Sequence, residues 1–114
     1  IKVRSYVGKK SSGTIQLIKD ISADVTNRHV ILVEDIIDSG HTIQFLMERV
    51  NSASPKSVSI ATFLIKPDMA KIDFAVDFIG FEIPPEFVVG YGLDYDQKLR
   101  HLNGVYSIES DTVV

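Results

Sequence analysis

A short polar stretch near the middle of the chain combines three carboxylates with two hydroxyls around a glycine, Gly40. These residues are Glu34, Asp35, Asp38, Ser39 and Thr42. Small and hydroxyl residues at the start of a helix leave amide N–H groups free to bind a phosphate or another anion. Carboxylates accept hydrogen bonds from a sugar diol and bind Mg²⁺ through oxygen. A phosphate cradle beside diol-binding acids is what a ribose 5-phosphate requires.

A simpler explanation is that these are ordinary loop acids and helix caps, which are common in proteins. Two unit charges about 4 Å apart repel by roughly 1 kcal/mol in water, and by about 4 kcal/mol at an effective dielectric constant near 20. Clustered acids therefore destabilise the free protein unless a cation or a helix N-terminus offsets them, and such clusters are often functional. The triphosphate-binding pattern G-x-x-x-x-G-K-[ST] is absent from the sequence.

The elements that must position these residues can be predicted from the pattern around them. Val30–Val33 is a run of four apolar residues, which predicts a strand buried on both faces in a parallel sheet. If Glu34 and Asp35 stay in strand geometry they point to opposite faces, so only a bend would bring both to one ligand. A turn at residues 38–40 then leads into a helix that ends near Ser52. Its apolar positions are Ile43, Leu46, Met47 and Val50.

Residues 33–42, Val-Glu-Asp-Ile-Ile-Asp-Ser-Gly-His-Thr, resemble the phosphoribosyl-diphosphate motif of type I phosphoribosyltransferases. The Glu-Asp-Ile-Ile-Asp core resembles the hypoxanthine–guanine branch in particular, and the likeness continues through residues 78–84 and 86–95. The resemblance implies an α/β fold of the type I phosphoribosyltransferase class, with a Rossmann-like parallel sheet flanked by helices. Residues 1–114 would form one domain, the C-terminal part of that fold. The implied reaction transfers 5-phosphoribosyl from phosphoribosyl diphosphate to hypoxanthine or guanine, giving IMP or GMP and pyrophosphate in purine salvage.

Length and composition limit the classes of protein to which this chain can belong. A chain of 114 residues with 45% apolar content is long enough for one domain with a core. The net charge of −3 gives no cationic field for nucleic acid, and the lack of cysteine excludes disulfides and Cys-based zinc sites. No apolar run approaches the roughly 18 residues of a membrane span, and no signal-peptide pattern opens the chain. We therefore expect a soluble, cytoplasmic domain.

The N-terminal residues alternate in the manner of two strands, Ile1–Val7 and Thr14–Ile18, separated by a polar loop. The pattern alone favours an ordinary β-hairpin. The resemblance instead places Ser5 and Tyr6 in the family's mobile catalytic loop, which closes over the reacting centre and excludes water. Asp20–Asn27 is predicted to form a short helical turn before the central strand.

Beyond the helix, Ser57–Ile65 reads as a second buried strand, and a strand–helix–strand unit of this kind makes a parallel crossover. Lys66 follows at the same sheet edge as Asp35. Its spacing alone favours a solvated lysine, whereas the resemblance assigns it to the exocyclic oxygen of a 6-oxopurine. Asp73–Phe81 is predicted to be a further strand.

In the C-terminal third, sequence grounds favour simple core packing for Phe87. The resemblance has this aromatic stack on the base, while the backbone of Val88 hydrogen-bonds the base edge. Asp94 is predicted to be a turn acid or the N-cap of a helix over Tyr95–Leu102, and Arg100 a charge near the end of that helix. By resemblance Asp94 contacts Mg²⁺ and Arg100 reaches pyrophosphate. Val105–Ile108 is predicted to be a last edge strand.

The resemblance also assigns the acidic loop residue by residue. Glu34 and Asp35 hold the ribose hydroxyls and, with Asp94, the cofactor Mg²⁺. Residues 38–42 hold the 5-phosphate, through Asp38, Ser39, Gly40, Thr42 and a backbone contribution from His41. Asp38 is the candidate acid/base at purine N7, and we expect two neighbouring acids and partial burial to raise its pKa from near 4.

Family members have a further N-terminal region that binds pyrophosphate, and the resemblance does not extend to it. We therefore expect the phosphoribosyl and purine contacts here, and an incomplete pyrophosphate site. Family members are usually dimers or tetramers, which makes a homo-oligomer the expectation. The alternative is a regulatory or truncated nucleotide-binding protein that has lost catalysis. A pyrimidine-type relative is a third possibility, against which Lys66 and Phe87 argue. The spacing of His29, His41 and His101 suits no metal site.

Overall fold

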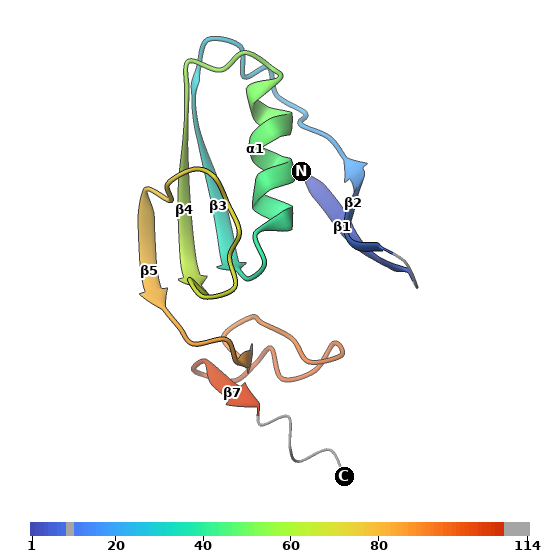
Figure 1. The fold of residues 1–114 in the computed structure, drawn as a ribbon, viewed down its shortest axis with the longest axis vertical. Helices are drawn as coiled ribbons and strands as arrows, with labels where there is room; N and C mark the ends of the chain where they lie inside the picture. Colours follow the sequence, from blue (N-terminus) through green and yellow to red (C-terminus); the bar gives the residue numbers. More distant parts are fainter. Residues whose placement is uncertain (9–10, 109–114) are drawn as a thin grey trace.

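A three-stranded parallel sheet with the order β3–β4–β5 lies at the centre of the chain in a computed structural model (Figure 1). Its strands are β3 (His29–Ile37), β4 (Ser57–Ile65) and β5 (Phe78–Glu82). The structure describes residues 1–8 and 11–108, and it describes side chains only outside residues 5–14. The strand predicted over Ser57–Ile65 is confirmed, and the central strand is longer than the predicted Val30–Val33.

Helix α1 (His41–Asn51) connects β3 to the parallel strand β4 and packs against both of them (Figure 1). Ile43, Leu46 and Val50 are buried, as their helical spacing predicts. The core joins Ile43 of the helix to residues of both strands, with Met47 packed at its margin. The predicted parallel β–α–β unit is therefore confirmed, and the expected α/β fold is present.

An extended segment between β4 and β5 covers the same side of the core as α1. Its alternate residues pack against the core, and these are Ala70, Ile72, Phe74 and Val76. Asp77 fastens its end to β4, since its Oδ2 atom accepts the N–H of Ile60 at 2.7 Å. The strand predicted over Asp73–Phe81 is thus wrong in its first half, because β5 begins only at Phe78. The alternation there reflects packing of an extended chain over the core, which looks like a strand in sequence.

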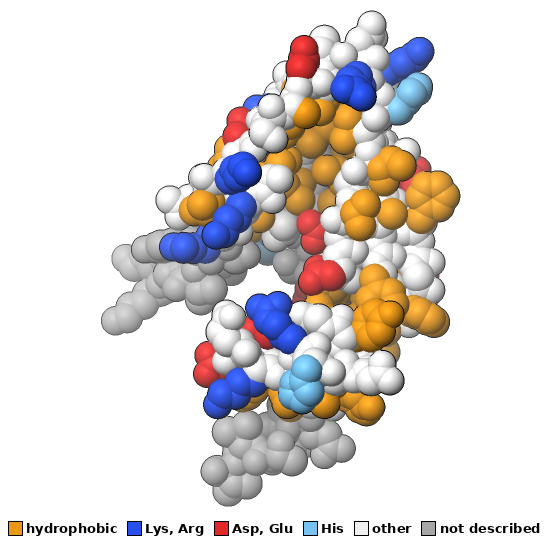
Figure 2. Space-filling view, turned by 180° about the vertical axis from the view of Figure 1, so that it is seen from behind, with side chains coloured by type: hydrophobic (Ala, Val, Ile, Leu, Met, Phe, Trp, Pro, Cys, Tyr) orange, Lys and Arg blue, Asp and Glu red, His pale blue; other side chains and the backbone are white. Residues whose placement is uncertain are grey.

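The opposite face of the sheet carries exposed apolar side chains. Ile31 is 62% exposed, Val33 78% and Phe78 62%. Figure 2 shows hydrophobic side chains lying openly at the surface on the side turned away from Figure 1, including the edge where β5 lies. Among the residues that the structure describes, α1 and residues 70–76 cover only one face of the sheet. The prediction that residues 30–33 are buried on both faces is therefore wrong.

The N-terminal strands β1 (Lys2–Gly8) and β2 (Ser11–Lys19) form an antiparallel pair, which confirms the predicted hairpin. Ser5 pairs with Ile15 and Tyr6 with Thr14 in its register. The side chains of Ser5 and Tyr6 lie outside those described, so their assignment to a catalytic loop stays a prediction.

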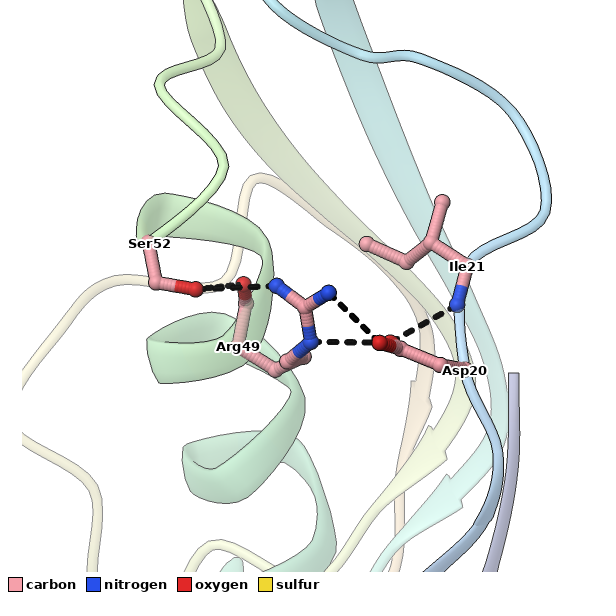
Figure 3. Close-up of polar contacts among 4 residues, drawn as sticks. All are labelled: Asp20, Ile21, Arg49 and Ser52. Atoms are coloured by element: carbon pink, nitrogen blue, oxygen red, sulfur yellow. Dashed lines mark hydrogen bonds and ion pairs between the residues drawn. The ribbon is translucent and has the colours of Figure 1, made fainter.

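An ion pair connects the segment after β2 to the last turn of α1 (Figure 3). Arg49 donates from Nε to Oδ1 of Asp20 at 2.8 Å and from Nη2 to Oδ2 at 2.6 Å. The hydrogen bond from Arg49, followed by the backbone N–H of Ile21, holds the pKa of Asp20 below its usual value. The helical turn predicted over Asp20–Asn27 is wrong, because the segment is irregular and turns at residues 26–27.

The C-terminal third contains a short antiparallel pair, β6 (Phe87–Val89) and β7 (Tyr106–Ile108), in which Phe87 pairs with Ile108. The predicted last strand is confirmed to within one residue. The helix predicted over Tyr95–Leu102 is wrong. Its residues include Asp96, Gln97 and Leu99 with φ of 50°, 67° and 68°, a left-handed conformation that a right-handed helix excludes.

Helix α1 is too short to span a bilayer, and no other helix in residues 1–8 and 11–108 is long and apolar enough to do so.

Candidate functional site

A cleft of about 320 Å³ lies where β3 ends and α1 begins. Three isoleucines line it together with the residues whose spacing suggested a ribose-phosphate site: Glu34, Asp35, Asp38, Ser39, Gly40 and Thr42. The predicted cluster is therefore a single concave site, at the carboxyl end of a parallel strand where α/β proteins bind ligands. His41 is outside this lining and lines a separate groove with Gln44 and Glu48.

Gly40 determines the shape of the turn. It is the N-cap of α1 with φ of 92°, and a Cβ atom at this position would lie 2.6 Å from Cγ2 of Ile72. The N–H of Lys71 donates to the carbonyl oxygen of Ser39 at 2.9 Å and fixes the turn from the other side. The N-cap residue Gly40 makes no side-chain hydrogen bond to the helix, and the N–H of His41 donates to Oγ of Ser39 at 3.5 Å. Gly40 and Thr42 line the cleft, so the start of the helix adjoins it with the partial positive charge that favours an anion.

Asp38 and Lys66 form an ion pair between the ends of two neighbouring strands. Ile37 and Ile65 are register partners, so the next residue of each strand leaves the sheet beside the other. Nζ of Lys66 lies 2.8 Å from Oδ2 of Asp38, with 7% of the lysine side chain exposed and 52% of the aspartate side chain. The expectation of a solvated lysine is wrong, and Lys66 is the cation that offsets the acid cluster.

Glu34 and Asp35 both line the cleft although β3 continues through both of them. Successive residues of a strand point to opposite faces, so the prediction that only a bend would bring both side chains to one ligand stays a prediction. Burial, and secondarily the charge of Asp35, raises the pKa of Glu34. The sequence led us to expect burial and neighbouring acids at Asp38, and the structure has them at Glu34 instead. Asp38 is half exposed and lies beside the ammonium of Lys66.

A second pocket of about 270 Å³ adjoins the first and shares Asp35 and Asp38 with it. Its lining adds the residues that the resemblance connects with a purine, Lys66, Phe87 and Val88, together with Leu93 and Asp94. Phe87 is 53% exposed, so the expectation of simple core packing is wrong. Sequence reasoning did not predict that Leu93 lines this pocket. The available sequence signal was its position just after Gly90 and Gly92, two glycines that indicate a tight turn.

Asp94 is a turn acid. Its Oδ2 atom accepts the N–H of Gln97 at 2.8 Å, and its Oδ1 atom lies 3.5 Å from Nη2 of Arg100. Arg100 also donates from Nη1 to the carbonyl oxygen of Gly92 at 3.0 Å. The expected helical role of Arg100 is therefore wrong, and the guanidinium braces the turn that carries Asp94.

Among residues 1–8 and 11–108, no three His, Cys, Asp or Glu side chains lie close enough together to hold a metal ion by themselves. Asp35 lines both pockets, with Glu34 in one and Asp94 in the other. Mg²⁺ is usually held by one or two carboxylates together with water and substrate phosphates. The oxygen donors at the pockets fit that manner of binding.

The comparisons with known proteins agree with one another. A family model for the phosphoribosyl transferase domain matches residues 1–96. The hypoxanthine phosphoribosyltransferase of Buchnera aphidicola is 46% identical over 95 residues, which are 83% of this chain and 54% of that protein. The hypoxanthine-guanine phosphoribosyltransferase of Aquifex aeolicus is 43% identical over 110 residues, which are 96% of this chain and 62% of that protein.

A solved structure of the Trypanosoma cruzi hypoxanthine phosphoribosyltransferase, in complex with the product IMP, superposes with a TM-score of 0.84 at 33% identity. The match covers 96% of this chain and 58% of that one. The chain thus spans between about half and three-fifths of the length of these relatives.

Proposed function

The chain belongs to the phosphoribosyl transferase domain family, and we propose that it carries the ribose-phosphate and purine sites of a hypoxanthine–guanine phosphoribosyltransferase. The reaction joins hypoxanthine or guanine to the 5-phosphoribosyl group of phosphoribosyl diphosphate, giving IMP or GMP and pyrophosphate. One observation carries the proposal: the two pockets share Asp35 and Asp38, and one offers helix amides while the other offers a cation and an aromatic ring.

The larger cleft takes the ribose 5-phosphate. The phosphate lies at the start of α1, against the amides and hydroxyls of Ser39, Gly40 and Thr42. The ribose hydroxyls donate to Glu34 and Asp35, which accept well as carboxylates. Because Glu34 has a raised pKa, a neighbouring cation or a diol that donates to it stabilises its ionised form.

The smaller pocket takes the purine. Phe87 presents an exposed ring on which a flat base can stack, and the backbone of Val88 is available to the base edge. Lys66 has three N–H donors and uses one on Asp38, so it can donate to the oxygen of a 6-oxopurine. It has no acceptor for the amino group of adenine. The complex of the Trypanosoma cruzi relative with IMP supports this class of ligand.

In the transfer step, N9 of the base forms a bond to C1 of the ribose while the bond from C1 to the diphosphate oxygen breaks. The proton on N7 passes to the Asp38 carboxylate, which lines both pockets and is therefore beside the joined base and sugar. Lys66 holds that carboxylate in place through the 2.8 Å ion pair. Pyrophosphate leaves on the side of Asp94 and Arg100.

Mg²⁺ is the cofactor in this proposal, held by Asp35 with Glu34 or Asp94. When bound, it neutralises the negative charge of the diphosphate leaving group. We place the protein in the cytoplasm as a homo-oligomer, in keeping with the family resemblance.

The chain should be incubated with phosphoribosyl diphosphate, Mg²⁺ and, separately, hypoxanthine, guanine, xanthine and adenine, and the nucleotide formed should be separated by chromatography. We expect IMP or GMP to form and AMP not to form. GMP binding without turnover would favour the non-catalytic nucleotide-binding alternative. A chain that neither binds GMP nor forms nucleotide would overturn the proposal.

A further inference from the structure

Tyr95 packs edge-to-face against the ring of Phe87. The ring centroids lie 5.9 Å apart and the ring planes are at 80°. Such T-shaped pairs are the preferred geometry of two aromatic rings, since the positive edge of one meets the negative face of the other. Phe87 lines the smaller pocket, whereas Tyr95 is not among the described residues of that lining. Tyr95 therefore contacts the ring of Phe87 from outside the described lining of that pocket.

The backbone around Tyr95 is fixed by a tight turn. The N–H of Tyr95 donates to the carbonyl of Lys98 at 2.8 Å, and the N–H of Lys98 donates back at 2.9 Å. The two residues between them, Asp96 and Gln97, both have positive φ, as a type I′ turn requires. The carboxylate of Asp94, the residue before Tyr95, accepts the N–H of Gln97 and so adds a further hydrogen bond to the turn. Non-glycine residues keep such a conformation only where their surroundings impose it.

We propose that Tyr95 is a positioning residue that sets the plane of the Phe87 ring before the base arrives. This inference rests on the function proposed above, in which Phe87 stacks on the purine. Phe87 is 53% exposed in a strand of three residues, so its ring would otherwise lose rotational freedom on binding. A ring already held by Tyr95 loses less rotational freedom when the base binds. The entropic cost of binding is therefore smaller, and the base binds more tightly. Affinity for the ribose-phosphate part of the ligand is unaffected.

The test compares Tyr95→Leu with Tyr95→Phe in the whole chain, and uses Tyr91→Leu as the matched control. Tyr91 also packs on a phenylalanine, Phe63, at 5.8 Å between centroids, but it lies outside the described lining of the smaller pocket. Calorimetry should show GMP binding about 3- to 10-fold more weakly in Tyr95→Leu, with the affinity for ribose 5-phosphate unchanged. Tyr95→Phe keeps an aromatic edge and should restore GMP affinity, and Tyr91→Leu should leave it intact.

A second measurement needs no ligand. In NMR spectra of the free chain, Tyr95→Leu should shift the ring resonances of Phe87, and Tyr95→Phe should leave them near their original positions. If GMP affinity is the same in wild type and Tyr95→Leu, or if both ligands weaken equally, the positioning role is overturned while the proposed function stands. If the wild-type chain binds no GMP, the proposed function fails, and the role of Tyr95 fails with it.

Discussion

Lys66 and Asp38 share an ion pair whose two members differ sharply in exposure. The ammonium of Lys66 is almost fully buried, whereas the carboxylate of Asp38, 2.8 Å away, is half exposed to water. Water can therefore solvate Asp38 when its partner is removed, and it reaches Lys66 poorly when Asp38 is removed. Breaking a pair by leaving a buried charge alone is far more destabilising than replacing that charge by an apolar group of similar shape.

The first prediction concerns stability. Asp38→Asn should lower the free energy of unfolding by about 1–3 kcal/mol, because it leaves a buried ammonium without its anion. Lys66→Met fills the same space without a charge and should change the free energy of unfolding by no more than about 1 kcal/mol. Urea unfolding of the two variants and of the double variant measures the difference. A larger loss in Lys66→Met than in Asp38→Asn would contradict the asymmetry.

The second prediction concerns catalysis. Asp38→Asn should lower the turnover of a complete enzyme by at least about 100-fold, since an amide cannot take the proton from N7, and GMP should still bind. Asp68→Asn, an exposed acid in the segment after β4, is the matched control and should retain full turnover. Steady-state kinetics combined with calorimetry separates binding from chemistry. Unchanged turnover in Asp38→Asn would remove Asp38 from the acid/base role.

The third prediction tests the turn before α1. Gly40→Ala imposes left-handed strain of about 1–2 kcal/mol and also drives a methyl group against Ile72. Gly92→Ala has nearly the same φ, 96° against 92°, with nothing within 4 Å of the added methyl. Gly40→Ala should therefore destabilise the chain more in chemical unfolding and weaken ribose 5-phosphate binding. Equal effects of the two substitutions would show that the contact with Ile72 is relieved without cost.

The fourth prediction concerns pH. The raised pKa of Glu34 means that the folded chain binds a proton there more readily than the unfolded chain does. The contribution of Glu34 to stability is therefore greatest at low pH and is lost as pH rises from the unfolded pKa through the raised folded one. Glu34→Gln should raise the free energy of unfolding at pH 7 and reduce the dependence of that free energy on pH above about pH 4.3. A lower melting temperature for Glu34→Gln at pH 7 would contradict this, with Glu48→Gln as the control for an exposed helix acid.

The sequence predicted best where a single periodicity determined the structure. The helix over residues 41–51, the strand at Ser57–Ile65 and the three acids around one cleft all follow from local spacing and from the geometry of a parallel sheet. Lys66 was placed at the right edge but in the wrong environment, because burial of a lysine depends on the residue opposite it in the register, and register is not visible in a single strand.

The errors have identifiable causes. Residues 95–102 have a polar and apolar pattern compatible with a helix, but positive φ at three of them is set by long-range contacts and turn chemistry that spacing does not encode. The extended segment before β5 alternates like a strand without pairing as one. Phe87 was assigned to the core because a lone aromatic in an apolar run usually packs there, and only the fold reveals the pocket beside it.

The uncovered face of the central sheet has a thermodynamic consequence. Ile31, Val33 and Phe78 are already largely hydrated in the folded chain, so unfolding brings little additional apolar surface into water at these positions. The heat capacity change on unfolding scales with newly hydrated apolar area, and for most domains it is about 12–15 cal/mol/K per residue. We expect this chain to fall below that range, which gives it a flatter stability curve and a shallower dependence on cooling than its length alone would suggest.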